Sequence, residues 1–386
     1  MSGATADGNV VQGNHVGTDV TGTVALGNGL RGVQVQDNAT NTLIGGVQPG
    51  AGNIIAANGE FGIRITVEPT GTLIQGNYIG TNPSGATGLG NIQHGVSIEA
   101  NNNAIGGMAP GAGNTIANNG GDGVYIENSI EISSTGNTIQ GNAIFGNSDL
   151  GIDLAPDGVT PNDSGDADTG PNNLQNFPLL ADASSDGSST TVDGSLDSSP
   201  NTNFRLEFFA STACDPSGYG EGERYLGSSD VATDANGDTS FSVTLSGGTS
   251  LGEFVTATAT DESGNTSEFS ACAAVTEGAI VASNYHWRYE YDGVNRLTYA
   301  CSDWDTDTAS CVGDAFDYSY DGAGNLLSFS RWDEAGAQVE TVSFVYNSAN
   351  QIACQDGGGN GACGDPYDVA YSYDAYAFMD LYFYAY

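Results

Sequence analysis

The sequence predicts an all-β protein in three parts: a right-handed parallel β-helix (a solenoid), a β-sandwich and a series of antiparallel hairpins. Three observations predict this fold class. Segments in the first part repeat at a fixed offset. The second part has longer runs in which apolar and polar residues alternate, and regularly spaced Tyr-Asp pairs fill the last part. A chain of 386 residues is long enough for two or three domains. We place them at 1–180, 181–277 and 284–386.

Internal repeats predict the solenoid. The segment GNHVGTDVTG at Gly13 returns as GNYIGTNPSG at Gly76, sixty-three residues later. A shorter theme, Gly followed by two apolar residues around one variable position, begins at Gly32, Gly62, Gly95, Gly123 and Gly151. Alternation with a period of two predicts short strands, and the intervening Gly and Asn residues suit tight corners. Frequent Gly and paired Asn residues exclude helices.

Stacked coils explain how such short strands are buried. Each coil cannot bury its Val and Ile side chains alone, so neighbouring coils must cover them. We expect one internal column to contain Val33, Ile63, Val96, Val124 and Ile152. At a corner, Asn53, Asn114 and Asn137 are expected to form a hydrogen-bonded ladder. The alternative is a β-sandwich of repetitive hairpins, which would have longer and less regular strands.

The repeats resemble those of parallel β-helix repeat proteins of bacterial and archaeal surfaces, a family of large secreted proteins. The resemblance covers Gly8 to about Leu180 and rests on GNYIGT, LGN and GVSI followed by IGG. It implies an extracellular or cell-surface location. Pectate lyases, polygalacturonases and alginate epimerases share the β-helix shape, but a fold does not carry a particular chemistry with it.

The second segment has longer alternating runs, such as NFRLEFFAS from Asn203 and EFVTATATD from Glu253. Runs of this length between DANGD and DESGN turns predict a small antiparallel sandwich. The closing VTATATDESGNTSEFS resembles the immunoglobulin-like modules of bacterial surface proteins. We therefore expect this segment to be an immunoglobulin-like spacer.

The third segment repeats a Tyr-rich frame. It begins as YEYDGVNRL at Tyr289, YSYDGAGNLL at Tyr318 and FVYNSANQI at Phe344, and a degenerate copy starts at Tyr371. Alternating Tyr residues predict strands, and the Asp-Gly and Gly-Asn pairs predict the hairpin turns. The frame resembles the YD repeats of RHS-type proteins, with ordinary Tyr-rich hairpins as the alternative. Few copies, and a chain that starts almost directly on repeat sequence, suggest truncation at both ends.

The six cysteines fall into short-range pairs: Cys214 and Cys272, Cys301 and Cys311, Cys354 and Cys363. An even number in such pairs predicts disulfides and an oxidising compartment. The alternative is zinc, which favours a CxxC-like spacing or clustered His residues, and neither occurs.

Charge narrows the choice of partners. The formal net charge is −40, with seven Arg residues and no Lys. Binding to nucleic acid or to an anionic membrane surface depends on basic side chains, so we expect neither partner. No apolar run reaches the roughly 18 residues that span a bilayer.

The candidate catalytic carboxylates are Asp149 and Asp153, on one side of the last coils. Glycoside hydrolysis uses two carboxylates, one of them protonated. Lyase chemistry is disfavoured because Arg31 and Arg64 are the only Lys or Arg residues before Arg205. We therefore expect a non-catalytic structural or adhesive protein that presents its surface to glycans, cells or matrix. The alternatives are a polysaccharide lyase or hydrolase, and a fragment of an RHS-type toxin-delivery protein.

A calcium site is the one cofactor prediction. Asp163, Asp166 and Asp168 lie within six residues, with Asp157 just upstream, and Gly165 allows a tight turn. Calcium prefers six to eight oxygen ligands of this kind. The alternative is a solvated acidic linker at the end of the solenoid. No organic cofactor is expected.

Overall fold

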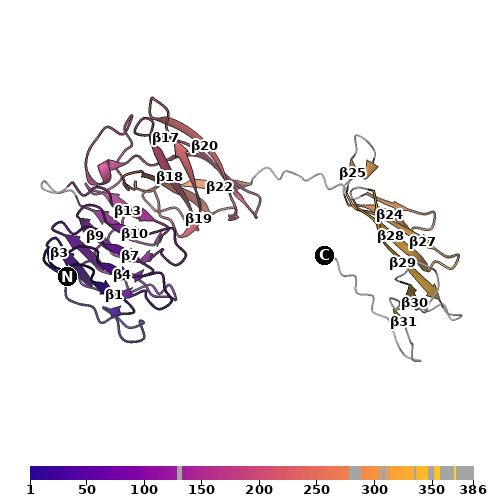
Figure 1. Cartoon of the computed structure of the whole chain (residues 1–386), viewed down its shortest axis with the longest axis horizontal. Helices are drawn as coiled ribbons and strands as arrows, with labels where there is room; N and C mark the ends of the chain where they lie inside the picture. The colour runs from indigo at the N-terminus through magenta and orange to yellow at the C-terminus, as the bar shows by residue number, and fades with distance from the viewer. Residues whose placement is uncertain are drawn as a thin grey trace. The chain divides into compact units, whose positions relative to one another are not determined.

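The computed structural model describes residues 1–127, 133–277, 288–302, 304–305, 310–311, 313–333, 336–346, 352–356 and 369–370. The chain forms two compact units, Met1–Ala279 and Ile280–Tyr386. Strands build both units, and within the described ranges the one helix is a 3₁₀ turn, η1 (Pro171–Leu174) (Figure 1). None of the helical structure in these ranges has the length and apolar composition that crossing a membrane requires. The all-β prediction is confirmed.

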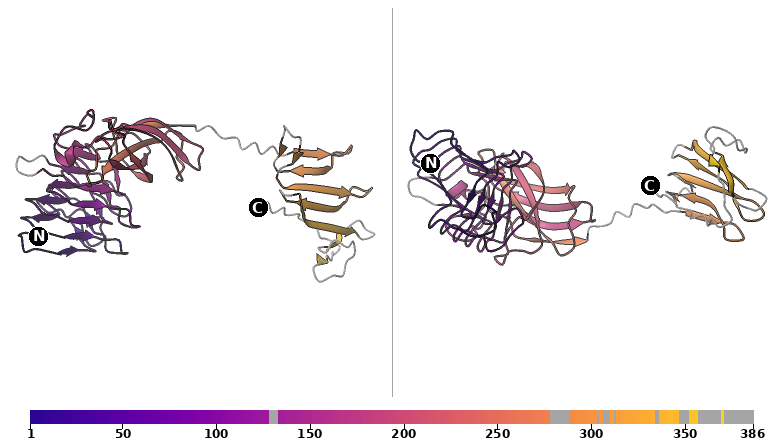
Figure 2. Two further views of the ribbon diagram at one scale, coloured as in Figure 1. Left: turned by 45° about the horizontal axis from the view of Figure 1, so that its top comes forward. Right: turned by 90° about the horizontal axis from the view of Figure 1, so that it is seen from below.

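Residues 10–154 form a β-solenoid of about five turns, in which each turn gives one short strand to each of three parallel sheets (Figure 2). One sheet has the order β1 (Val10–Val11), β4 (Leu43–Gly45), β7 (Leu73–Gln75), β10 (Ala104–Gly106) and β13 (Thr138–Gln140). The second has the order β14 (Ala143–Phe145), β11 (Thr115–Ala117), β8 (Tyr78–Ile79), β5 (Ile54–Ile55) and β2 (His15–Val16). The third has the order β15 (Ile152–Leu154), β12 (Val124–Ile126), β9 (Val96–Glu99), β6 (Ile63–Thr66) and β3 (Val33–Gln36).

Columns of Val and Ile fill the interior of the solenoid. Successive residues of a strand point to opposite faces, so alternate residues point inwards. The predicted column is confirmed, since its members pair in register and are buried: Val33, Ile63, Val96, Val124 and Ile152. The next inward position gives a second buried column of Val35, Ile65, Ile98, Ile126 and Leu154. Burial of each such side chain stabilises the fold by about 1.5–3 kcal/mol.

Asparagine side chains form three ladders at the corners of the coils. The first contains Asn14, Asn53, Asn77, Asn114 and Asn142. The second contains Asn103, Asn137 and Asn172, and the third Asn28, Asn58, Asn91, Asn119 and Asn147. Asn53 and Asn114 share a ladder as expected, but Asn137 does not belong to it. Asn137 precedes β13 in the first sheet, whereas the other two precede strands of the second sheet.

The third ladder ends on a carboxylate instead of another amide. Glu221, from the segment after the solenoid, accepts hydrogen bonds from the backbone nitrogen of Asn147 at 3.0 Å and from Nδ2 of Asn147 at 2.9 Å. It also accepts from the backbone nitrogen of Gly146. Buried donors without an acceptor destabilise a fold. Glu221 therefore caps the second sheet at its last strand, β14.

Two further glutamates cap the other two sheets. Glu207 accepts from the backbone nitrogen of Gly141, just after β13, at 2.8 Å. Glu268 accepts from the backbone nitrogens of Leu154 and Thr160 at 3.0 and 2.9 Å. Burial raises the pKa of both Glu207 and Glu221, and that of Glu268 to about 7. The end of the solenoid thus receives one glutamate on each of its three sheets.

The segment after the solenoid forms one mixed, barrel-like sheet of seven strands that is nearly closed, because its edge strands β19 and β20 contact each other. Its order is β19 (Arg224–Ala232), β18 (Asn203–Ser211), β21 (Phe254–Asp261), β22 (Ala273–Glu277), β16 (Leu179–Ser185), β17 (Thr190–Asp197) and β20 (Asp238–Leu245). This single sheet differs from the predicted sandwich, in which two separate sheets would pack face to face. The short strand β22 pairs antiparallel with β21 and parallel with β16, and so joins both halves. The expected disulfide Cys214–Cys272 is present.

The second unit contains an antiparallel sheet. Its order is β23 (Arg288–Tyr291), β24 (Leu297–Cys301), β27 (Ala315–Tyr320), β28 (Leu326–Trp332), β29 (Gln338–Tyr346), β30 (Ile352–Asp356) and β31 (Val369–Ala370). A separate pair consists of β25 (Trp304–Asp305) and β26 (Ser310–Cys311). The turns of the first two Tyr-rich frames share one construction. Oδ1 of Asp292 accepts from the backbone nitrogens of Val294 and Arg296, and Oδ1 of Asp321 accepts from the corresponding residues of its own turn.

Three further predictions concern this unit: two disulfides and a degenerate copy of the Tyr-rich frame. The disulfide Cys301–Cys311 is present. Cys363, the expected partner of Cys354, lies outside the described residues, as does the degenerate frame that starts at Tyr371.

We expect Glu221→Ala to lower the free energy of unfolding of the unit Met1–Ala279 by at least about 2 kcal/mol, because each buried unpaired donor costs about 1–3 kcal/mol. Urea denaturation of the whole chain measures the change. The matched control is Glu277→Ala, which removes an exposed glutamate at the end of β22. Equal unfolding midpoints for the two variants would show that the cap does not stabilise the solenoid.

Candidate functional site

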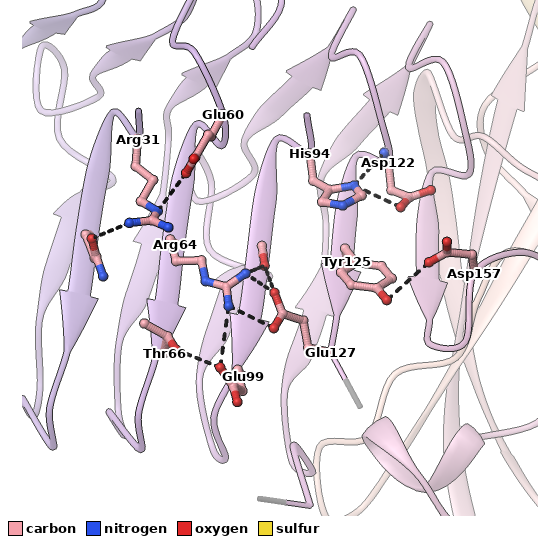
Figure 3. Close-up of polar contacts among 12 residues, drawn as sticks. Arg31, Glu60, Arg64, Thr66, His94, Glu99, Asp122, Tyr125, Glu127 and Asp157 are labelled. Carbon is pink, nitrogen blue, oxygen red and sulfur yellow. Dashed lines mark hydrogen bonds and ion pairs between the residues drawn. The ribbon is translucent and has the colours of Figure 1, made fainter. Parts of the chain in front are cut away.

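The outer face of the third sheet carries two rows of mostly charged, polar and aromatic side chains (Figure 3). One row comes from the second residue of each strand, which points outwards because its neighbours point into the core. In register, this row is Gln34, Arg64, Ser97, Tyr125 and Asp153. The other row comes from the residue before the Gly that starts each repeat: Arg31, Phe61, His94, Asp122 and Leu150.

The arginines of this face are ion-paired with glutamates. Nε of Arg31 lies 3.1 Å from Oε2 of Glu60. Nη2 of Arg64 lies 2.8 Å from Oε2 of Glu127 and 3.4 Å from Oε2 of Glu99. Figure 3 shows these pairs on neighbouring coils. The positive charge at this end of the face is therefore already neutralised by the protein.

Three aromatic rings stack along the face. The ring centroids of Phe61 and His94 are 5.6 Å apart, and those of His94 and Tyr125 are 4.6 Å apart, with 15° between the planes in both cases. The guanidinium of Arg64 lies 5.0 Å from the centroid of Phe61. Nδ1 of His94 lies 3.0 Å from both the backbone nitrogen and Oδ2 of Asp122, which fixes the orientation of the imidazole.

A groove of about 540 Å³ lies at the end of this stack, between the last coils and the loop after Cys214. His94 and Tyr125 line it together with five aspartates: Asp122, Asp149, Asp153, Asp157 and Asp215. Among its lining residues there is no arginine. The groove is therefore a strongly acidic site on a sheet face whose arginines are ion-paired.

Asp153 has an unusual environment in this groove. Its side chain is 2% exposed; Oδ2 accepts from the backbone nitrogen of Gly158 at 2.8 Å, and the buried Oδ1 has no hydrogen-bond partner among the described residues. Burial, with Asp122 and Glu268 nearby, raises the pKa of Asp153 to about 8. At neutral pH its carboxyl group is protonated and can donate a proton or a hydrogen bond.

Tyr125 connects the aromatic stack to the acidic groove. Its hydroxyl group donates to Oδ1 of Asp157 at 3.2 Å. Burial and the negative charge of Asp157 raise the pKa of the phenol to about 12. Tyr125 therefore stays neutral and offers an apolar ring with a polar end, a combination suited to ligands that are partly apolar and partly hydrogen-bonding.

The structure places the predicted site residues in two locations. Asp149 and Asp153, the candidate catalytic pair, both line the groove. Asp157, expected as a calcium ligand, also lines the groove and does not belong to the group formed by Asp163, Asp166 and Asp168.

Sequence reasoning missed His94, Asp122, Tyr125 and Asp215 as site residues. A signal existed for the first three, because each occupies an outward position of the repeat immediately before or two residues after its Gly. Once the strand phase is known, these positions align on one face. Asp215 lies in the sequence far from the last coil, and no local pattern connects it with the groove.

The acidic group of Asp163, Asp166 and Asp168 could hold a metal ion, since one carboxylate oxygen from each lies within 4.8 Å of the others. Burial raises the pKa of Asp166 to about 6 and also raises that of Asp168. Asp166 accepts hydrogen bonds from Oγ of Ser198 and the backbone nitrogen of Asn176, which hold it in place. Clustered carboxylates are the oxygen donors that calcium prefers, so the residues present fit this ion.

The chain was compared with known proteins. No protein-family model matches it, and no curated protein matches it significantly.

We expect Asp153→Asn to change the pH dependence of stability. The folded-state pKa of Asp153 lies above its ordinary value of 3.8, so the contribution of its protonated form is complete below that value and is lost as the pH rises towards about 8. Asn keeps the shape and cannot ionise. Between about pH 4 and pH 8 the wild-type melting temperature should fall relative to that of the variant, as measured by calorimetry. Asp182→Asn, at an exposed position, serves as the control. If the melting temperatures of all three proteins change with pH in parallel, the pKa of Asp153 is not raised.

We expect calcium to raise the melting temperature of the first unit by several degrees, because an ion that binds only the folded state stabilises it. The measurement compares chelator with millimolar calcium. Asp166→Asn should abolish the shift, whereas Asp234→Asn, in an exposed hairpin turn, should preserve it. Identical melting in chelator and calcium would exclude Asp163, Asp166 and Asp168 as a calcium site.

Proposed function

We propose that this chain is a secreted or cell-surface protein that binds glycans on the outer face of β3, β6, β9, β12 and β15. Its work is adhesive and non-catalytic. The observation that carries the proposal is the stack of Phe61, His94 and Tyr125, which ends at a groove lined with carboxylates. Sugar rings have apolar faces that pack on aromatic rings and hydroxyl groups that bond to carboxylates. A site that combines both features suits them.

Several features support the rest of the proposal. The disulfides Cys214–Cys272 and Cys301–Cys311 suit an oxidising compartment. Connections between parallel strands of one sheet are right-handed in nearly all proteins, which favours a right-handed solenoid. The Asp-centred turns at Asp292 and Asp321 support the resemblance to YD repeats.

A second candidate function is hydrolysis of a glycan in the same groove. The observation that favours it is Asp153, a carboxyl group protonated at neutral pH beside Asp149 and Asp157. A glycosidase needs one protonated carboxyl group as general acid and a second carboxylate as base or nucleophile. In this reading Asp153 is the acid.

We expect Tyr125→Ala to weaken binding to a polysaccharide about tenfold, because a lost aromatic contact of about 1.4 kcal/mol corresponds to this factor. Isothermal titration with neutral, anionic and cationic oligosaccharides measures the change. Tyr291→Ala, an exposed tyrosine of the second unit, is the matched control.

The same mixtures distinguish binding from hydrolysis when reducing ends are followed over time. Binding without release of reducing ends supports the adhesive function. Release of reducing ends that disappears in Asp153→Asn would show that the chain hydrolyses glycans and would overturn the adhesive function. Absence of binding to every oligosaccharide would refute a glycan-binding function.

A further inference from the structure

The residues that line the groove do not balance its negative charge. Five aspartates line it, and the one basic side chain among the lining residues is that of His94, whose Nδ1 already lies 3.0 Å from Oδ2 of Asp122. The arginines of the same sheet face are ion-paired with Glu60, Glu99 and Glu127. Asp149, Asp153, Asp157 and Asp215 therefore share a confined space without a cation from the lining residues.

Asp153 adds an independent indication of a ligand. It lines the groove, is almost completely buried, and leaves Oδ1 without a donor among the described residues. A buried polar atom without a partner costs about 1–3 kcal/mol. An ammonium group supplies three donors and a positive charge, so it would satisfy Oδ1 and reduce the repulsion among the neighbouring carboxylates. Because a nearby cation lowers the pKa of a carboxyl group, Asp153 would release its proton to solvent when the ammonium group binds.

The shape of the groove favours an extended cationic ligand over a metal ion. A metal ion needs ligand atoms that converge on one point. Among the described residues, the group whose carboxylate oxygens converge in this way is Asp163, Asp166 and Asp168, which does not line the groove. The groove aspartates instead lie along a volume of about 540 Å³, from the coil of Asp122 to the loop of Asp215.

The loop that carries Asp215 is tied to the segment after the solenoid by a disulfide and a backbone hydrogen bond. It follows Cys214, which is bonded to Cys272, and the backbone nitrogen of Ser217 donates to Oδ1 of Asp215 at 2.8 Å. The backbone nitrogen of Gly220 donates to the carbonyl oxygen of Ser270 at 3.0 Å. A fixed acidic wall opposite the last coils selects a ligand by its charge without a conformational change.

We propose that the groove binds a polysaccharide built from amino sugars with free, protonated amino groups, one of which pairs with Oδ1 of Asp153. This inference rests on the glycan-binding function proposed above and specifies its substrate class. The ring of Tyr125 packs on the sugar, Asp157 and Asp149 attract neighbouring amino groups, and uronate-containing glycans are repelled.

The test is isothermal titration of the full chain at about pH 6 with three probes. These are a β-1,4-linked glucosamine hexamer, its fully N-acetylated counterpart and an oligogalacturonate of the same length. We expect the glucosamine hexamer to bind at least tenfold more tightly than the N-acetylated one, and the oligogalacturonate not to bind. Raising the salt concentration should reduce this preference.

Variants separate a specific site from general attraction to an acidic protein. Asp157→Asn removes a carboxylate of the groove, and Asp153→Asn removes the carboxylate that forms when the ligand binds, so each should reduce the preference at least fivefold. Asp182→Asn removes an exposed carboxylate elsewhere and should preserve the preference. A preference that all three variants weaken equally, or none weakens, overturns the proposed pairing. Binding that depends on Tyr125 but does not distinguish the two hexamers overturns the substrate class and leaves glycan binding intact.

Discussion

The dependence of each coil on its two neighbours is the constraint on which the rest of the solenoid is built. Its strands are two to four residues long, too short to be stable alone. Backbone hydrogen bonds, the Val and Ile columns and the asparagine ladders all run between successive coils. These interactions support one another, so a fault in one coil is transmitted first to the coils above and below it.

The same constraint explains how far the sequence could be interpreted. The Gly that starts each repeat sets the phase of the strand after it, and this was enough to predict the column from Val33 to Ile152. It was not enough for Asn137, because the corner that an asparagine occupies depends on which sheet the next strand joins. The third segment could be predicted as hairpins because Asp292 and Asp321 act within their own turns.

Features built from distant segments could not be predicted in this way. Glu207 and Glu268 look like ordinary strand and loop residues, and their roles depend on a contact with the end of the solenoid. Asp215 reaches the groove for the same reason. Asp149 and Asp153 could be predicted as neighbours because they lie in one coil. The raised pKa of Asp153 could not, because it comes from burial, which the sequence does not show.

The three glutamate caps also determine how the molecule meets others of its kind. The last rung of a solenoid exposes strand edges with unpaired groups, and such edges act as templates for further chains. Here the carboxylates of Glu207, Glu221 and Glu268 already occupy donors at that rung. Another copy could join there only by displacing them. The caps therefore oppose the stacking of a second solenoid on this end.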